Sequence, residues 1–419
     1  MTLFRKIWGF LFSNFMWLYI IMGLLSWVGI YPMTFQLLMF VGFLYSVTLF
    51  PKFRMRSILD LSVVIYLFYI LMNSILIDYP HHFELFRNEI FFSLLPISFY
   101  YIAKSTDIDI DYYINKMILP MVIVMIIGIV LYIENPPWYS ALKYAQLLDS
   151  YGYTEATVPD RMLREAFRLS SIWNTAYVIG YANGFFILYL LKRLMTDELT
   201  KSQRRITLLL FVLSFVVMIL AGFKALMLAF VVSILLFFAL VGDKKKKEKL
   251  IFGAVSILIV TVLIIVSFDS EYYEFFINRF QDTVSEEGLA YRLEHTGGGI
   301  ELNTVFGAGY GHYGMAAKNF SNGWFIQDSQ YQKVLAELGY FGFAIFIFML
   351  LAAGFSAFNK KCILELCILA TYMISFIGSS SISAETTFPF IFWYAVGRIS
   401  RKTGMVSRVN APSQVKTHI

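Results

Sequence analysis

Two long apolar stretches joined by a very short turn decide the fold class. Residues 206–241 read ITLLLFVLSFVVMILAGFKALMLAFVVSILLFFALV, and Lys224 is their only charged residue. The apolar residues form continuous runs over 206–221 and 225–241 rather than alternating with polar ones, which excludes membrane-spanning β-strands. Each run approaches the roughly 20 residues that a helix needs to cross a bilayer. The stretch therefore predicts a hairpin of two membrane-spanning helices.

Similar apolar runs cover most of the chain. Hydrophobic types make up 58% of the 419 residues, charged types make up 15%, and mean hydropathy is +0.67. Soluble domains average about 45–50% apolar and about 25% charged residues, so the composition excludes a soluble enzyme, a disordered chain and a nucleic-acid-binding domain. We expect an all-α polytopic membrane protein, with a single transmembrane domain over residues 1–419. The twelve expected spans are 7–29, 32–50, 57–77, 90–103, 113–133, 171–191, 206–221, 225–241, 250–267, 331–356, 362–380 and 388–397, of which the fourth and twelfth are short.

The charges between these runs predict an orientation. With the N-terminus inside, 24 of the 34 Lys and Arg residues fall on the inner side, whereas only 9 of the 28 Asp and Glu residues do. A miscounted span would invert every later loop and destroy this asymmetry, so the positive-inside rule favours twelve spans with both termini cytoplasmic. The two longest connections, 134–170 and 268–330, then lie outside, and long loops in compact proteins are often functional.

Four cations stand out on the acidic outer side. Arg168 ends the first long loop, Lys224 lies in the tight turn, and Arg279 and Arg292 lie in the second long loop. Each of them could be a loop charge or an interface anchor. Lys224, however, opposes the positive-inside bias and is costly there unless it faces a cavity or a partner. Cations at this level suit a phosphate or pyrophosphate near the lipid headgroups.

The second long loop is rich in glycine. It contains YRLEHTGGGI at 291–300 and FGAGYGHYG at 306–314, which include Tyr310 and His312, and Trp324 follows. Glycine permits positive φ and close backbone approach, and backbone N–H groups in such loops can bind anions, although a plain flexible turn fits the composition equally well. No His-Glu-x-x-His pattern occurs, so we expect no metal site.

Acidic residues mark the start of the tenth apolar run. Asp328 is either the N-cap of this helix or a general base. Glu337 lies within the helix and needs a polar partner, and Lys333 lies four residues earlier on the same face. Tyr331 accompanies them, and Glu385 is a further outer carboxylate of lower specificity.

Four motifs in this order resemble the bacterial O-antigen polymerase and O-antigen ligase superfamily, membrane glycosyltransferases that use undecaprenyl-pyrophosphate sugars. They are Arg168-x-x-Ser171-x-Trp173 followed by Gly180, the turn Gly222-Phe223-Lys224, Arg292 with Phe306-Gly307-Ala308-Gly309, and Asp328-x-x-Tyr331 with Glu337, Gly339 and Gly342. The chain departs from the family pattern in having Lys224 in place of Arg, and Asp328 where ligases usually have His. The second departure favours the polymerase branch.

The resemblance implies a polymerase of the bacterial inner membrane. It would transfer a growing chain from one undecaprenyl-pyrophosphate carrier to the non-reducing-end hydroxyl of a lipid-linked repeat unit, with inversion and without cofactor or metal. Arg168, Lys224, Arg279 and Arg292 would bind pyrophosphate, Asp328 would be the base with His312 in reserve, and Tyr310, Trp324 and Tyr331 would contact sugars. Loops 134–170 and 268–330 would cap the active site.

The expected partners are lipid-linked oligosaccharides, membrane lipid and, as a further candidate, a chain-length regulator protein, with no nucleic acid. Two alternatives remain open. One is a ligase that transfers polysaccharide to lipid A core, and the other is a flippase or sugar transporter without chemistry. Large outer loops and few charges within the spans speak against transport.

Overall fold

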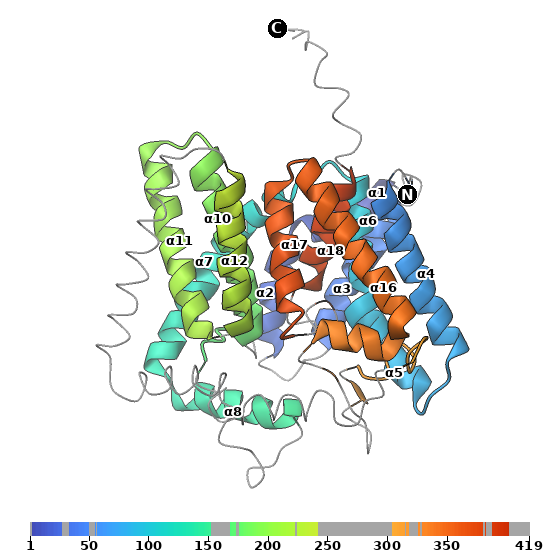
Figure 1. Cartoon of the computed structure of the whole chain (residues 1–419). Coiled ribbons are helices and arrows are strands. Elements are labelled where there is room, and N and C mark those ends of the chain that lie inside the picture. The colour runs from blue at the N-terminus through green and yellow to red at the C-terminus, as the bar shows by residue number, and fades with distance from the viewer. Residues whose placement is uncertain are drawn as a thin grey trace, which may run out of the picture.

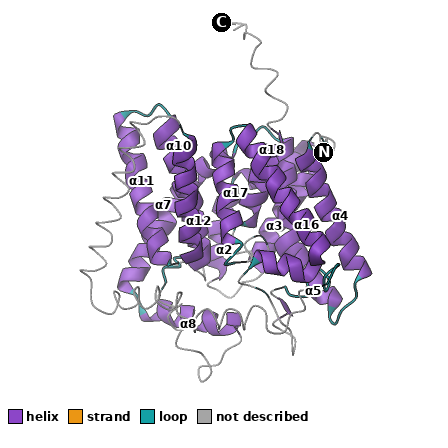
Figure 2. Ribbon diagram, viewed as in Figure 1, coloured by secondary structure: helices purple, strands orange, loops and turns teal. Residues whose placement is uncertain are grey.

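The computed structural model describes residues 2–26, 33–49, 55, 57–151, 168–172, 176–222, 224–241, 304–314, 316–317, 326, 329–379, 382 and 388–401. Every regular element in this part of the chain is helical, as the apolar runs predict (Figure 2). Five helices are long and apolar enough to cross a membrane by length and composition, namely Ile58–Leu76, Ile110–Glu134, Val178–Thr196, Lys201–Ala221 and Gln330–Asn359.

Of the expected spans, 32–50, 57–77, 113–133, 225–241 and 331–356 match a helix within three residues at each end, whereas the other described ones differ by more or are divided. The helices are α1 (Thr2–Ser13), α2 (Phe15–Ser26), α3 (Met33–Leu49), α4 (Ile58–Leu76), α5 (His82–Glu89), α6 (Ser98–Ser105), α7 (Ile110–Glu134), α8 (Pro137–Tyr151), α10 (Ala176–Thr196), α11 (Lys201–Ala221), α12 (Lys224–Leu240), α16 (Gln330–Asn359), α17 (Ile363–Ser375) and α18 (Pro389–Arg401). The run 250–267 lies outside the described residues, so the count of twelve spans stays a prediction.

The fourth apolar run differs from its expected bounds. Helical structure is continuous from α5 through a π-helical turn (Ile90–Leu94) and a 3₁₀ turn (Leu95–Ile97) into α6, and so it covers residues 82–105 instead of 90–103. The polar residues of α5 conceal this extension in a hydropathy profile. At about 1.5 Å per residue, the longer segment has the length of a membrane span. π-Helical turns occur frequently at functional sites, and Glu89 directly precedes this one.

The helices form a bundle with two distinct ends. α10 packs against α11, α12 against α17, α4 against α16, and α6 against α18. Figure 1 shows α8 lying across one end of the bundle, which is also the end where α5 begins, while the first turn of α1 and the last turn of α18 lie at the opposite end. The loop predicted over 134–170 therefore begins with a helix that covers part of the expected outer end.

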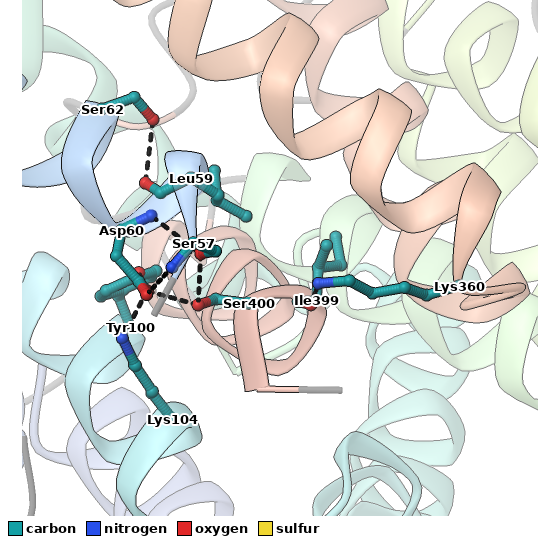
Figure 3. Close-up of polar contacts among 9 residues, drawn as sticks. All are labelled: Ser57, Leu59, Asp60, Ser62, Tyr100, Lys104, Lys360, Ile399 and Ser400. Carbon is teal, nitrogen blue, oxygen red and sulfur yellow. Dashed lines mark hydrogen bonds and ion pairs between the residues drawn. The ribbon is translucent and has the colours of Figure 1, made fainter. Parts of the chain in front are cut away.

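Buried ionic contacts fasten the opposite, expected cytoplasmic end. Asp60 is fully buried and accepts hydrogen bonds from Tyr100, Ser400 and the Ser57 N–H, and its carboxylate lies 2.5 Å from Lys104 Nζ (Figure 3). Around this cluster, Arg398 pairs with Asp109, Arg401 with Asp107, and Lys192 with Asp111. These contacts join the starts of α4 and α7 to the ends of α6, α10 and α18.

The long helix α16 is broken at Gly339, where φ is 67° and ψ is −172°. In a regular helix the carbonyls of Ala336 and Glu337 would accept from the N–H groups of residues 340 and 341. Here they accept from Ala308 N–H (2.9 Å) and Gly309 N–H (3.1 Å). The freed N–H groups of residues 340 and 341 donate to the carbonyls of residues 304 and 305, each at 3.2 Å. The glycine-rich loop thus inserts into the helix and completes its hydrogen bonding.

Two glycines permit this insertion. A methyl group on Gly307, whose φ is 80°, would lie 2.2 Å from the Glu337 carbonyl oxygen, and one on Gly339 would lie 2.4 Å from the Gly307 nitrogen. The conformation of Gly339 is essentially restricted to glycine. α4 supports the inserted loop, because the Asn73 side chain donates to the Phe306 carbonyl (2.7 Å) and accepts from Tyr310 N–H (2.8 Å).

We predict that Gly307→Ala and Gly339→Ala each destabilise the protein by about 3 kcal/mol or more, through positive-φ strain and backbone overlap. Thermal unfolding of the purified protein in detergent measures this change. The matched control is Gly354→Ala, also in α16, where the new methyl group would make an ordinary 3.9 Å contact with Leu369 and the helix gains propensity. Equal melting temperatures for Gly339→Ala and Gly354→Ala would contradict the inserted-loop account.

Candidate functional site

Most N–H groups over residues 308–314 of the glycine-rich loop donate to acceptors within the protein. Besides the two that bond α16, His312 N–H donates to Gly309 O (3.2 Å), Tyr313 N–H donates to Glu337 Oε1 (3.1 Å), and Gly314 N–H donates to Gly311 O (3.0 Å). These donors are already paired and are not available to bind an anion, whereas the glycines at 297–299 lie outside the described residues. The glycines at 307 and 309 serve close approach to α16 and α4.

A cluster of three buried ionisable side chains lies beneath this loop. Lys333 Nζ lies 2.8 Å from Glu89 Oε1 and 4.0 Å from Glu337 Oε1, and all three residues are at most 2% exposed. The expected pairing of Lys333 with Glu337 is therefore confirmed, and Glu89, the last residue of α5, joins it directly before the π-helical turn. Ser93 Oγ donates to the second oxygen of Glu89 at 2.5 Å. We call Glu89, Lys333 and Glu337 the buried ionic cluster.

His312 lies at the edge of this loop. Its ring meets Tyr79 edge-on, with centroids 4.8 Å apart, and Nδ1 is buried without a hydrogen-bond partner among the described residues. Burial lowers the pKa of His312 below its ordinary value, because removal from water disfavours the charged imidazolium. His312 is therefore neutral at pH 7 and can accept a proton.

The start of α16 is held by an N-cap and by backbone hydrogen bonds to neighbouring segments. Its N-cap is Ser329, whose Oγ accepts from Gln332 N–H (3.3 Å), so the alternative that Asp328 is the N-cap is wrong. Gln330 N–H donates to Phe376 O (2.9 Å), and Ile326 N–H donates to Tyr313 O (3.0 Å). Asp328 itself lies outside the described residues, but Ile326, two residues before it, and Ser329, directly after it, are both hydrogen-bonded to other segments.

The two described tyrosines of the predicted site pack inside the protein. Tyr310 is 5% exposed, and its carbonyl accepts from the Tyr79 hydroxyl at 2.7 Å. The Tyr331 hydroxyl donates to Met373 O at 2.9 Å, and its ring packs edge-on against Phe376. Their sugar contacts stay predictions. Trp324, Arg279 and Arg292 lie outside the part of the chain that the structure describes.

Arg168 belongs to a second group, at the junction of α8, α10 and α11. It is buried, and the segment 168–172 is held by Leu169 N–H donating to Leu220 O (3.2 Å) and Ser171 Oγ donating to Val124 O (2.6 Å). Arg168 Cγ would lie 3.9 Å from a methyl group on Gly222, the residue with φ of 63° that ends α11. The structure thus brings Arg168 to the turn from which Lys224 begins α12.

α8 contributes a third cation to this group, Lys143, which the sequence reasoning missed. Lys143 Nζ donates to the Arg168 carbonyl at 2.5 Å and lies 5.2 Å from the centre of the Tyr139 ring. The Tyr139 hydroxyl in turn contacts Ser170 Oγ at 3.0 Å. The only sequence feature that indicates a contact of Lys143 is its spacing from Tyr139, one helical turn earlier. Glu89, likewise missed, was signalled only as an acid next to an apolar run.

The two groups are linked through the segment that follows α17. Gln330, the first residue of α16, donates its N–H to Ser379 O at 3.2 Å. The Ser379 hydroxyl contacts the Tyr181 hydroxyl of α10 at 3.2 Å. α10 follows the Arg168 segment in the chain, so the start of α16 and the Arg168 group are tied to one framework.

Residues 209–347 match the model of the O-antigen ligase family. The matched segment contains the Lys224 turn, the inserted glycine-rich loop with His312, and the break in α16. A comparison with curated proteins found no match. The family match confirms the resemblance to the O-antigen ligase and polymerase superfamily. Together with the five long apolar helices, it indicates a membrane protein with a function of O-antigen ligase or polymerase type.

We predict that Lys143→Met loosens the Arg168 segment, because it removes a charge-assisted hydrogen bond worth about 1.5–3 kcal/mol. Hydrogen exchange at the Leu169 amide should accelerate by about 10-fold or more. Lys116→Met is the control, since Lys116 lies over the Tyr112 ring on α7 at 4.9 Å, away from this segment. If exchange at Leu169 is the same in both variants, Lys143 does not hold the segment.

Proposed function

Because residues 209–347 match the O-antigen ligase family model, we propose that the protein is a membrane glycosyltransferase that polymerises undecaprenyl-pyrophosphate-linked oligosaccharide repeat units. The product is O-antigen or a related surface polysaccharide, formed at the periplasmic face of the inner membrane. The observation that carries this proposal is the position of the matched segment. This segment contains the turn with Lys224 and the loop with His312. Transfer from a pyrophosphate donor requires a cation to stabilise the leaving pyrophosphate and a group to accept the proton, and these two places supply them.

The proposed reaction is a direct displacement without metal. A hydroxyl of the acceptor repeat unit attacks the anomeric carbon of the donor chain, and the bond from that carbon to the pyrophosphate oxygen breaks. The electron pair leaves with the pyrophosphate, whose charge Arg168, Lys224, Arg279 and Arg292 stabilise. The hydroxyl proton goes to Asp328, and the anomeric carbon is inverted. His312, neutral because it is buried, is the reserve base.

The two residue groups divide this work. The Arg168 group provides buried and anchored positive charge where α8 crosses the bundle end, which suits a pyrophosphate at headgroup level. The start of α16 and the inserted loop supply the proton acceptor. Tyr310, Trp324 and Tyr331 are proposed sugar contacts, and loops 134–170 and 268–330 are the proposed cap. A chain-length regulator is a proposed partner.

Ligation is the second candidate function, because the matching model is described as O-antigen ligase. In that reaction the acceptor would be lipid A core instead of a second repeat unit. The donor chemistry and the cation requirement would be the same. Asp328 at the position of the ligases' His favours the polymerase.

We predict that Arg168→Ala, Lys224→Ala and Arg292→Ala abolish polymer while the protein still accumulates in the membrane. Each removes a contact to pyrophosphate worth several kcal/mol in the transition state, a loss of roughly two or more decades in rate. Lys224→Arg should retain partial activity because charge survives while geometry changes. Polysaccharide gels of a deletion strain carrying each variant report the result, with Lys116→Ala as the control. Near-normal polymer from Lys224→Ala and Arg292→Ala would reduce these cations to interface anchors.

We predict that Asp328→Asn lowers the rate by roughly 10²–10⁴, because the amide cannot accept the proton. Since Ser329 caps α16, the helix start should be unaffected. The lipopolysaccharide gel should then show lipid A core bearing one repeat unit and no ladder. Bare core with long chains on the lipid carrier would instead assign the protein as the ligase. A full ladder would remove Asp328 as the base and move that role to His312.

A further inference from the structure

The buried ionic cluster carries more charge than the packing of helices requires. One ammonium and two carboxylates, from Lys333, Glu89 and Glu337, are removed from water within one turn of α16 and the end of α5. Burying unpaired charge is very costly, and even a good buried ion pair is often no more stabilising than an apolar replacement of similar volume. A cluster of this composition therefore calls for a reason other than stability.

The hydrogen bonds of Glu337 indicate that reason. Glu337 Oε1 accepts from Tyr313 N–H (3.1 Å), and the Tyr313 carbonyl accepts from Ile326 N–H (3.0 Å). Tyr313 directly follows His312, and Ile326 lies two residues before Asp328 in the sequence. The backbone of one residue, Tyr313, therefore connects the chain at both candidate bases to the Glu337 carboxylate.

Lys333 and Glu89 determine where that carboxylate lies. Lys333 Nζ lies between the two acids, and Glu89 is itself held by Ser93. The loop backbone packs closely against the Glu89 side chain. A methyl group on Gly314 would lie 2.3 Å from Glu89 Oε1, and one on Gly311 would lie 3.1 Å from Glu89 Cγ. A shift of the Glu89–Lys333 pair must therefore move the loop, and with it His312.

We propose that Glu89 and Lys333 are positioning residues for the glycosyl transfer, acting through Glu337 and Tyr313 on the segments that carry His312 and Asp328. They are buried and do not touch substrate. This inference rests on the proposed function. Arg168 and Lys224, two of the proposed pyrophosphate-binding cations, belong to another group, so disturbing the ionic cluster changes the rate of the chemical step and leaves binding of the lipid-linked donor intact.

The structure offers a matched control at the other end of the bundle. Lys104 and Asp60 form an ion pair of comparable burial, 9% and 0% exposed, with a 2.5 Å contact. Lys104→Met and Lys333→Met make the same chemical change in buried positions. The first removes the lysine beside one buried carboxylate, Asp60, and the second removes it beside two, Glu89 and Glu337. Both should lower the melting temperature. Only Lys333→Met should affect the chemistry.

The test uses the full-length protein in nanodiscs with a synthetic lipid-pyrophosphate-linked repeat unit, and it scales activity to the folded fraction. We expect Lys333→Met and Glu89→Gln to lower kcat by about 10- to 100-fold with KM within about threefold of wild type, since a displacement of about 1 Å can cost that much. Lys104→Met should keep the wild-type kcat. Wild-type kcat in folded Lys333→Met or Glu89→Gln would overturn the proposal.

Two further variants keep the test decisive if the single variants do not fold. The double variant Lys333→Met with Glu89→Gln removes one charge of each sign, so the net charge of the cluster stays the same while Glu337 keeps its hydrogen bond from Tyr313 N–H. Glu89→Asp retains the charge but withdraws the carboxylate by one methylene group. The same fall in kcat is expected from both, and a wild-type kcat from either overturns the proposal.

A second readout does not depend on activity. Hydrogen exchange at the Tyr313 and Ile326 amides should accelerate in Lys333→Met and in Glu89→Asp, and remain unchanged in Lys104→Met. If the wild-type protein shows no polymerisation, the proposed function fails, while this exchange pattern still tests the link from the cluster to the two segments. Unchanged exchange in Lys333→Met would refute that link whatever the reaction is.

Discussion

The four main-chain hydrogen bonds that close the break in α16 are the contacts on which the rest of the candidate site depends. A helix in an apolar environment cannot leave N–H and C=O groups unpaired, so the break at Gly339 requires an external partner for each freed group. The loop at 304–309 supplies all four. Once it is inserted there, the positions of Tyr310, His312 and Tyr313 follow, and Asn73 and Tyr79 secure the loop from the other side.

The two ends of the bundle handle buried charge differently. At the expected cytoplasmic end, Asp60 has one lysine, two hydroxyl donors and an N–H group, and neighbouring arginines pair with aspartates in a loop. At this end the buried charges are paired, and the pairs hold neighbouring helices together. At the expected outer end, one lysine lies near two glutamates. The oxygen of Glu337 that faces Lys333 also accepts from Tyr313 N–H of the inserted loop, and the second oxygen of Glu89 accepts from Ser93 in the π-helical turn. Charge there supports a specific backbone arrangement next to the segments proposed to do chemistry.

The proposed pyrophosphate-binding group and the proposed proton acceptor lie on different elements for a physical reason. Arginine and lysine that must face a diphosphate at headgroup level need an anchored backbone. α8, α7 and α11 provide it by bonding the 168–172 segment from three directions. A base needs a position fixed relative to the sugar, and the capped start of α16 with its inserted loop provides that. Ser379, between Gln330 and Tyr181, joins the two groups.

Sequence alone determined the helical class of the described residues, because uninterrupted apolar runs leave a chain only one local structure in a membrane. It predicted the bounds of five spans to within three residues, and the family resemblance. It also paired Lys333 with Glu337, since residues four apart share a helix face. It could not extend the fourth run to residue 82, because α5 is polar and joins the span through an irregular π-helical turn. The sequence also did not reveal Glu89 or Lys143, because their partners Lys333 and Arg168 are distant in the sequence. It could not distinguish glycines that bind an anion from glycines that allow two backbone segments to pack closely. Those outcomes depend on which segments lie side by side, and only the tertiary structure decided them.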